Sequence, residues 1–186
     1  MKVWSKTVLS VYRYLEALSK ALDNLIIKKS VNSMFYTNSK GISAYDCASE
    51  IIELTQRKIN LINIKVLVED ALNKLSFEHK RILMLCYVDG LKTSEITKLM
   101  GCVERTYFRK KDEALVGFGK AIKCMGIDER ALDEMFGKEK WLRDLHDKNS
   151  EREAVGRLHK DVPEYNFLKK VIKELSKVNL QTSYGY

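Results

Sequence analysis

Residues 90–122 read Gly-Leu-Lys-Thr-Ser-Glu-Ile-Thr-Lys-Leu-Met-Gly-Cys-Val-Glu-Arg-Thr-Tyr-Phe-Arg-Lys-Lys-Asp-Glu-Ala-Leu-Val-Gly-Phe-Gly-Lys-Ala-Ile. The first part predicts a helix of about two turns, capped by Thr93 or Ser94. Its apolar positions are Ile96, Leu99 and Met100. Gly101 can adopt a positive φ, so a second helix begins within about three residues. So short a link makes the two helices cross steeply.

The second helix, expected over residues 103–122, has two different faces. Its core-facing stripe consists of Tyr107, Ala114, Leu115, Phe118 and Ile122. The opposite face of its first two turns carries Glu104, Arg105, Phe108 and Arg109. A steep crossing makes this start project from the body, which suits entry into a DNA major groove about 12 Å wide.

The side chains on the projecting start have the chemistry of base and phosphate contacts. Arg105 and Arg109 point the same way, and arginine pairs with both guanine acceptors or with a phosphate. Glu104 either accepts from a cytosine amine or only favours the helix dipole. Phe108 packs on a thymine methyl or folds back onto the core. The expected DNA-contacting residues are Thr93, Glu104, Arg105, Thr106, Phe108, Arg109, Lys110 and Lys111, with Thr106, Lys110 and Lys111 nearer the DNA backbone.

The segment before this pair completes a module over residues 76–122. Ser76 is the expected N-cap of a helix that ends at Asp89-Gly90, where glycine can take the left-handed conformation. Its residues at core spacing are Ile82, Leu83, Leu85 and Cys86. The module therefore has three helices.

The module resembles the fourth conserved region of bacterial sigma factors. The matching residues are Leu75-Ser76, Ile82-Leu83, Gly90-Leu91, Glu95-Ile96, Leu99-Met100-Gly101, Thr106 and Ala114-Leu115. The run from Glu104 to Arg109, with Glu113-Ala114-Leu115, is more similar still to phage late-gene activators of the ArpU and RinA type. The match covers about a quarter of the chain and implies an all-α helix-turn-helix that reads promoter DNA.

The sequence departs from the sigma pattern at three positions. Val103 stands where a Ser or Thr cap is usual, Thr97 where a small Ala packs, and Lys111 where an apolar residue is frequent. The N-terminal half also lacks the aromatic-rich segment with which complete sigma factors melt the −10 element. A sigma-like regulator is therefore expected rather than a complete sigma factor.

Amphipathic helices are expected on both sides of the module. Apolar residues recur at helical spacing over residues 4–28, residues 30–43 read as a loop, and a second helix begins near Ser43 and breaks near Asn60–Asn63. Beyond Gly126, alternating charges indicate a solvated helical face, and residues 164–178 form a last amphipathic helix. These patterns divide the chain into an N-terminal helical region (1–70), the DNA-binding domain (71–125) and a charged extension (126–186).

Composition agrees with a helical polyanion binder. Nine Gly and one Pro are few for the many turns of a β fold, so an all-α fold is expected. The formal charge of +8 attracts nucleic acid. The cysteines lie far apart, and the sequence contains no phosphate-binding loop, metal motif or paired catalytic carboxylates, so neither an enzyme nor a cofactor or metal is expected. The absence of a long apolar stretch or a signal-peptide core predicts a cytoplasmic location, without membrane or small-molecule partners.

The sequence therefore predicts a sequence-specific, double-stranded DNA-binding transcription regulator, bacterial or phage-encoded. RNA polymerase and a second copy of the chain are candidate partners, because the apolar stripes of the N-terminal helices suit docking or dimerisation as well as burial in the chain's own core. Two alternatives remain at this point. One is a DNA-packaging oligomer similar to a phage terminase small subunit, and the other is a module that binds RNA polymerase without DNA specificity.

Overall fold

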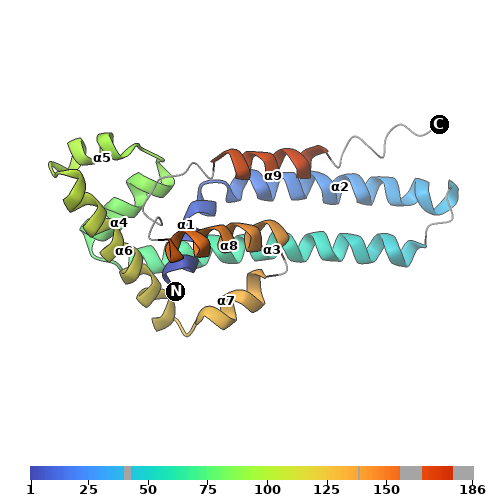
Figure 1. The fold of residues 1–186 in the computed structure, drawn as a ribbon. Helices are drawn as coiled ribbons and strands as arrows, with labels where there is room; N and C mark the ends of the chain where they lie inside the picture. The colour runs from blue at the N-terminus through green and yellow to red at the C-terminus, as the bar shows by residue number, and fades with distance from the viewer. Residues whose placement is uncertain (40–42, 138, 156–164, 178–186) are drawn as a thin grey trace. The chain divides into compact units, whose positions relative to one another are not determined.

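The computed structural model describes residues 1–39, 43–137, 139–155 and 165–177, and every regular element in them is helical (Figure 1). The expected all-α fold is confirmed. The elements are α1 (Lys2–Tyr12), α2 (Leu15–Ser39), α3 (Ala44–Asn73), α4 (Phe77–Leu83), the π-helical turn η1 (Met84–Val88), α5 (Thr93–Met100), α6 (Glu104–Cys124), α7 (Glu129–Phe136), α8 (Lys140–Ala154) and α9 (Tyr165–Lys177). None of the helices in the described ranges is long and apolar enough to cross a membrane.

The chain forms two compact units, and each is discontinuous in sequence. Unit 1 contains residues 1–13 and 64–163, and unit 2 contains residues 14–63 and 164–186. These units differ from the three consecutive regions expected from the sequence, 1–70, 71–125 and 126–186, because each unit joins segments that are far apart in the chain. Packing brings α1 to the module and its C-terminal neighbours, whereas α9 packs against α2.

The helix expected over residues 4–28 is two helices. A turn at Arg13 and Tyr14 separates α1 from α2, and the two helices belong to different units. Neither Gly nor Pro stands at this turn. The apolar periodicity continues on both sides of it, so the pattern alone suggested one helix.

Most of the loop expected over residues 30–43 is also helical, because α2 continues to Ser39; residues 40–42 lie outside the described part of the chain. Turn-favouring side chains are accommodated by bonding back to the helix. The hydroxyl of Ser30 donates to the carbonyl of Ile26 at 2.9 Å, and that of Ser33 donates to the carbonyl of Ser30 at 2.7 Å. Hydroxyls bonded in this way remain compatible with a helix.

Helix α3 runs without interruption from Ala44 to Asn73, so the break expected near Asn60–Asn63 is wrong. In unit 2, Leu54 and Leu61 of α3 are buried. Ion pairs connect α3 to α2, and they include Lys58 to Asp23 at 2.6 Å and Lys29 to Glu50. Helix α9 packs on α2 with Leu168 and Val171 buried, which confirms the expected last amphipathic helix over its described residues, 165–177.

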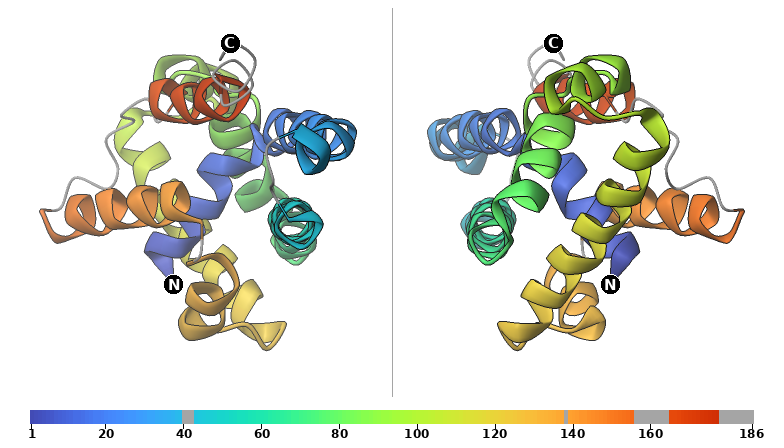
Figure 2. Two further views of the ribbon diagram at one scale, coloured as in Figure 1. Left: turned by 90° about the vertical axis from the view of Figure 1, so that its right-hand side faces the viewer. Right: turned by 90° about the vertical axis from the view of Figure 1, so that its left-hand side faces the viewer.

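Unit 1 is built around α1, which packs against α6 and α8 (Figure 2). Trp4 is buried, and its ring lies 4.4 Å from that of His146 and 6.4 Å from that of Phe136, measured between centroids. The buried amide of Asn149 donates to the hydroxyl of Thr7 at 3.2 Å. The charged segment beyond Gly126 therefore folds back through α7 and α8, and it buries one face instead of being solvated throughout.

Candidate nucleic-acid interface

Helices α4, α5 and α6 of unit 1 meet at one apolar cluster. Each helix contributes a fully buried residue, and these are Ile82, Ile96 and Tyr107. Half-buried side chains that pack on them are Leu85, Cys86, Leu91, Met100, Cys102 and Phe108. The cluster holds the start of α6 against α4 and α5. Separating these helices would expose its apolar surface to water.

The first helix of the module begins as expected and then changes its geometry. Ser76 caps α4, with its hydroxyl accepting from the amide of His79 at 3.4 Å. The π-helical turn η1 follows, and the amide of Asp89 donates five residues back to the carbonyl of Met84 at 3.0 Å. The chain then turns at Gly90, whose φ is +67°, so the expected end at Asp89-Gly90 is confirmed.

The link between α5 and α6 is the three-residue turn Gly101-Cys102-Val103. Gly101 has a φ of +60°, as expected from its position. The amide of Cys102 donates to the carbonyl of Thr97 at 3.1 Å, which satisfies a helix-end carbonyl that would otherwise lack a partner. The turn is therefore set by one left-handed residue.

The start of α5 differs from the expectation by one residue. Lys92, not Thr93 or Ser94, is the N-cap, because the carboxylate of Glu95 accepts the Lys92 amide at 2.7 Å. Thr93 is the first helical residue and is half-buried. Leu99, expected on the apolar face, is 55% exposed.

The core-facing stripe of α6 is confirmed, since Tyr107, Ala114, Leu115, Phe118 and Ile122 are all buried. The expectation that Lys111 lies near the DNA backbone is wrong. Lys111 is 2% exposed, and its ammonium lies 5.4 Å from the ring centre of Tyr87 and 5.7 Å from that of Tyr107. Its position on the buried stripe, where an aliphatic stem can pack and a cation can face aromatic rings, explains this placement.

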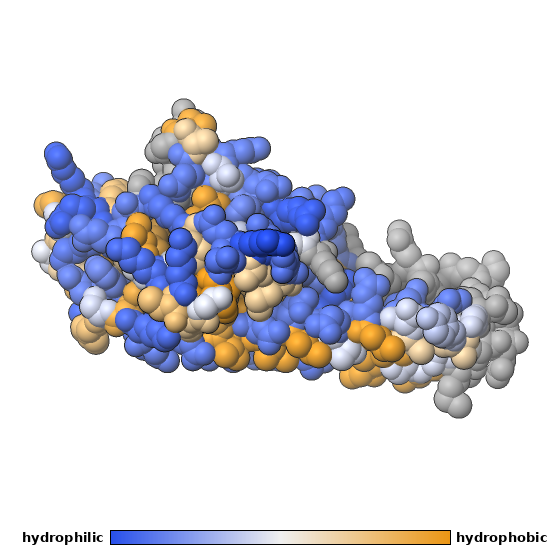
Figure 3. Space-filling model, turned by 90° about the horizontal axis from the view of Figure 1, so that it is seen from below, coloured by the Kyte–Doolittle hydropathy of each residue, from blue (hydrophilic) through white to orange (hydrophobic). Residues whose placement is uncertain are grey.

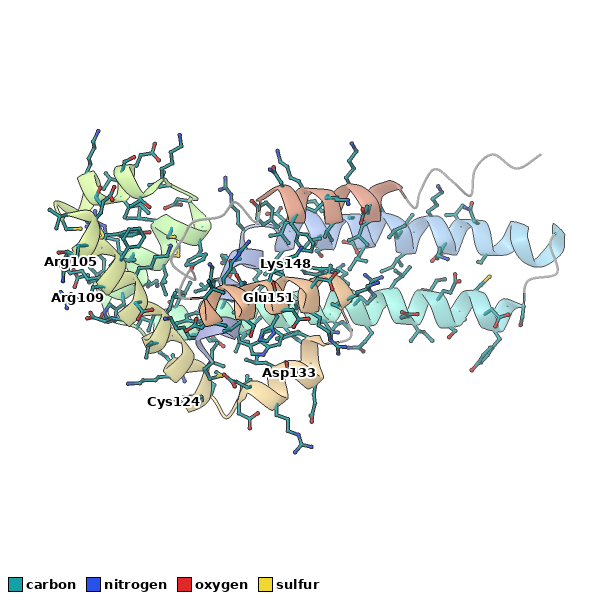
Figure 4. All side chains as sticks on the ribbon, viewed as in Figure 1. Arg105, Arg109, Cys124, Asp133, Lys148 and Glu151 are labelled. Atoms are coloured by element: carbon teal, nitrogen blue, oxygen red, sulfur yellow. The ribbon has the colours of Figure 1, made fainter. Side chains whose placement is uncertain are left out.

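Arg105 and Arg109 lie exposed on the outer side of α6 (Figure 4). Arg109 pairs with Glu113 one turn further along, at 2.9 Å, and its side chain remains 65% exposed. An exposed pair of this kind contributes only about 0.3–0.5 kcal/mol, so the guanidinium can exchange the carboxylate for another acceptor at small cost. Glu104, in the first turn, is exposed as well.

Lys110 connects α6 to α4 through an ion pair with Glu78. Its hydrogen bond lowers the pKa of the Glu78 carboxyl, and the nearby charge of Lys110 acts in the same direction. The Lys110 side chain is still 26% exposed. Thr106 beside this face is half-buried. Both residues lie at the edge of the exposed surface of α6.

Phe108 folds back onto the protein. Its ring centre lies 5.1 Å from that of Tyr107, and the side chain packs on the cluster of Ile82, Ile96 and Tyr107. Of the two alternatives open from the sequence, the structure therefore favours packing in the core over an extended position from which it would meet a thymine methyl.

The segment that contains α5 and α6 carries an excess of positive charge. Residues 91–124 contain eight Lys or Arg against four Asp or Glu, so half of the chain's excess of +8 lies in this segment. Lys92, the N-cap of α5, and Lys98 within α5 are exposed cations that were not among the residues predicted from the sequence. Their position on the polar side of a short amphipathic helix could have identified them as candidates for DNA contact. Val103, the N-cap of α6, provides no side-chain hydrogen bond, which leaves the positive end of the helix dipole uncapped by its own residue.

Among the described residues, no group of three His, Cys, Asp or Glu side chains lies close enough to hold a metal ion. Comparison of the chain with protein family models, with curated proteins and with solved structures gave no match.

Proposed function

We propose that this protein is a cytoplasmic, sequence-specific transcription regulator that binds double-stranded DNA through a helix-turn-helix formed by α5 and α6. The observation that carries the proposal is the pair Arg105 and Arg109, exposed one turn apart on a helix whose opposite face is buried. A rigid helix start with two outward guanidinium groups suits guanine recognition in a major groove.

Each contact type has a candidate side chain. Arg105 and Arg109 would read base edges, and Lys110 would exchange Glu78 for a phosphate. Lys92 and Lys98 extend the positive surface along α5. Phosphate contacts position a protein on the duplex without reading its sequence, so base readout in this proposal rests on the two arginines.

The proposal is tested by selecting preferred sites from a random duplex library and measuring affinity by fluorescence anisotropy. Arg105→Ala and Arg109→Ala are each expected to cost about 1–3 kcal/mol, or about 5- to 150-fold in affinity, and to relax the preference at one base pair. The reason is that each substitution removes one bidentate base contact.

Arg130→Ala is the matched control, because Arg130 also pairs with a glutamate one turn along, Glu134, on the exposed surface of α7. It removes the same charge from a helix outside the proposed interface and should leave affinity within twofold (about 0.4 kcal/mol). The proposal fails if the protein enriches no sequence, or if both α6 variants retain wild-type affinity and base preference.

A further inference from the structure

One face of α3 in unit 2 exposes apolar side chains at seven-residue spacing. Tyr45, Ile52 and Ile59 are 79%, 69% and 42% exposed, and Ile62 beside them is 46% exposed. Seven residues are nearly two helical turns, so these side chains form one stripe along the helix. Orange atoms along the part of the surface that α3 forms show exposed apolar side chains there (Figure 3).

Over residues 44–63, the half of α3 that contains this stripe carries no charge. At 100° per residue, the half of the helix centred on Ile59 contains only uncharged side chains between positions 44 and 63. This uncharged α3 face consists of Ala44, Tyr45, Ala48, Ser49, Ile51, Ile52, Thr55, Gln56, Ile59, Ile62 and Asn63. Charged residues make up 31% of the chain, so a helix face that carries none of them along a segment of twenty residues is a distinct feature.

The charged residues of the same segment lie on its other sides. Glu50 and Lys58 pair with Lys29 and Asp23 of α2, next to the buried Leu54. Helix α3 therefore has one side committed to α2, while the uncharged face remains exposed. Burial of such apolar area releases about 25 cal/mol per Å², so the face favours a covering partner.

We infer that the uncharged α3 face binds the same face of a second copy of this chain. Charge selects this occupant: a face without cations offers nothing to nucleic acid or an acidic protein, and two chains of +8 can approach most easily where neither presents a charge. A two-fold axis places members of the face opposite members of the same face, apolar against apolar, with Ser49, Gln56 and Asn63 as neutral hydrogen-bonding neighbours.

Sedimentation equilibrium of the full chain without DNA tests the inference and is independent of the proposed DNA binding. The wild type is expected to approach twice the 21.5 kDa chain mass with rising concentration. Ile52→Lys combined with Ile59→Lys should sediment as a monomer, because it places four cations in the interface of two copies. Glu53→Lys is the control: it raises the charge of an exposed neighbour outside the face and should leave the dimer intact.

Circular dichroism reports whether the double variant folds. If it does not, Thr55→Arg provides the same test, because Thr55 is exposed and its replacement removes no apolar contact area of note. A wild type that stays monomeric, a dimer that survives the charged variants, or an assembly larger than two copies would overturn the inference.

Discussion

Lys111 shows how a single position can be read in two ways. In the sequence it extends the basic run after Arg109, yet the helix rotation places it on the stripe of Tyr107, Ala114 and Leu115. Burial of a lysine is tolerated here because its four methylenes pack as an apolar stem and its ammonium faces two aromatic rings. This is also the position where the sigma pattern places an apolar residue.

Lys111→Ala is therefore expected to lower the free energy of unfolding by about 2 kcal/mol or more, since it leaves a cavity in a packed site. Lys111→Met keeps most of the stem volume and should cost less than about 1.5 kcal/mol. Lys120→Ala, on an exposed position of the same helix, should change stability by less than about 0.5 kcal/mol. Urea denaturation measures all three, and equal effects of the Lys111 and Lys120 variants would contradict the buried placement.

At the scale of elements, the turn between α5 and α6 depends on Gly101. Its φ of +60° lies in the left-handed region, and a Cβ added there would meet no atom within 4 Å. A substitution at this position would therefore change the backbone energy without a steric clash. This separates the conformational role of glycine from any role in packing.

Gly101→Ala is expected to destabilise the protein by about 1–2 kcal/mol, the cost of a left-handed conformation for a residue with a Cβ. Gly117→Ala is the control, because it makes the same substitution at a glycine that has an ordinary helical conformation. Gly117 lies within α6, where a Cβ would make an ordinary 3.4 Å contact with Leu75 Cδ2, so alanine should be neutral or stabilise by up to about 1 kcal/mol. A urea midpoint that is unchanged or raised by Gly101→Ala would show that the turn does not require glycine.

For the whole molecule, charge sets how binding responds to salt. A chain of +8 with half its excess in residues 91–124 should release counterions on binding DNA through that segment. The affinity for any duplex is then expected to fall linearly on a plot of log K against log salt. The slope counts the phosphates that are neutralised, at about 0.9 per contact.

Lys110→Ala is expected to reduce the magnitude of this slope by about 1 and to weaken all sequences alike, because a phosphate contact carries no base preference. Lys140→Ala removes the same charge from an exposed position on α8 and should leave the slope unchanged. Anisotropy titrations at several salt concentrations provide both slopes. A loss confined to one sequence after Lys110→Ala would indicate a base contact instead.

Much of the module follows from residues that are close in sequence. The all-α fold, the Ser76 cap, the left-handed Gly101 and the buried stripe of α6 were predicted correctly. Each depends on local backbone preference or on helical spacing, and neither needs knowledge of distant contacts. The exposure of Arg105 and Arg109 follows from helical spacing as well, because both residues lie on the face of α6 opposite the buried stripe.

Only the tertiary structure decided how the helices are grouped. The apolar period continues through the turn at Arg13 and Tyr14, so spacing alone does not reveal that α1 packs with α6 and α8 while α2 packs with α9. The burial of Lys111 and the inward position of Phe108 depend on aromatic and apolar neighbours contributed by other elements. Local preference determines where a helix can form, but the burial of its faces depends on which distant segments meet them.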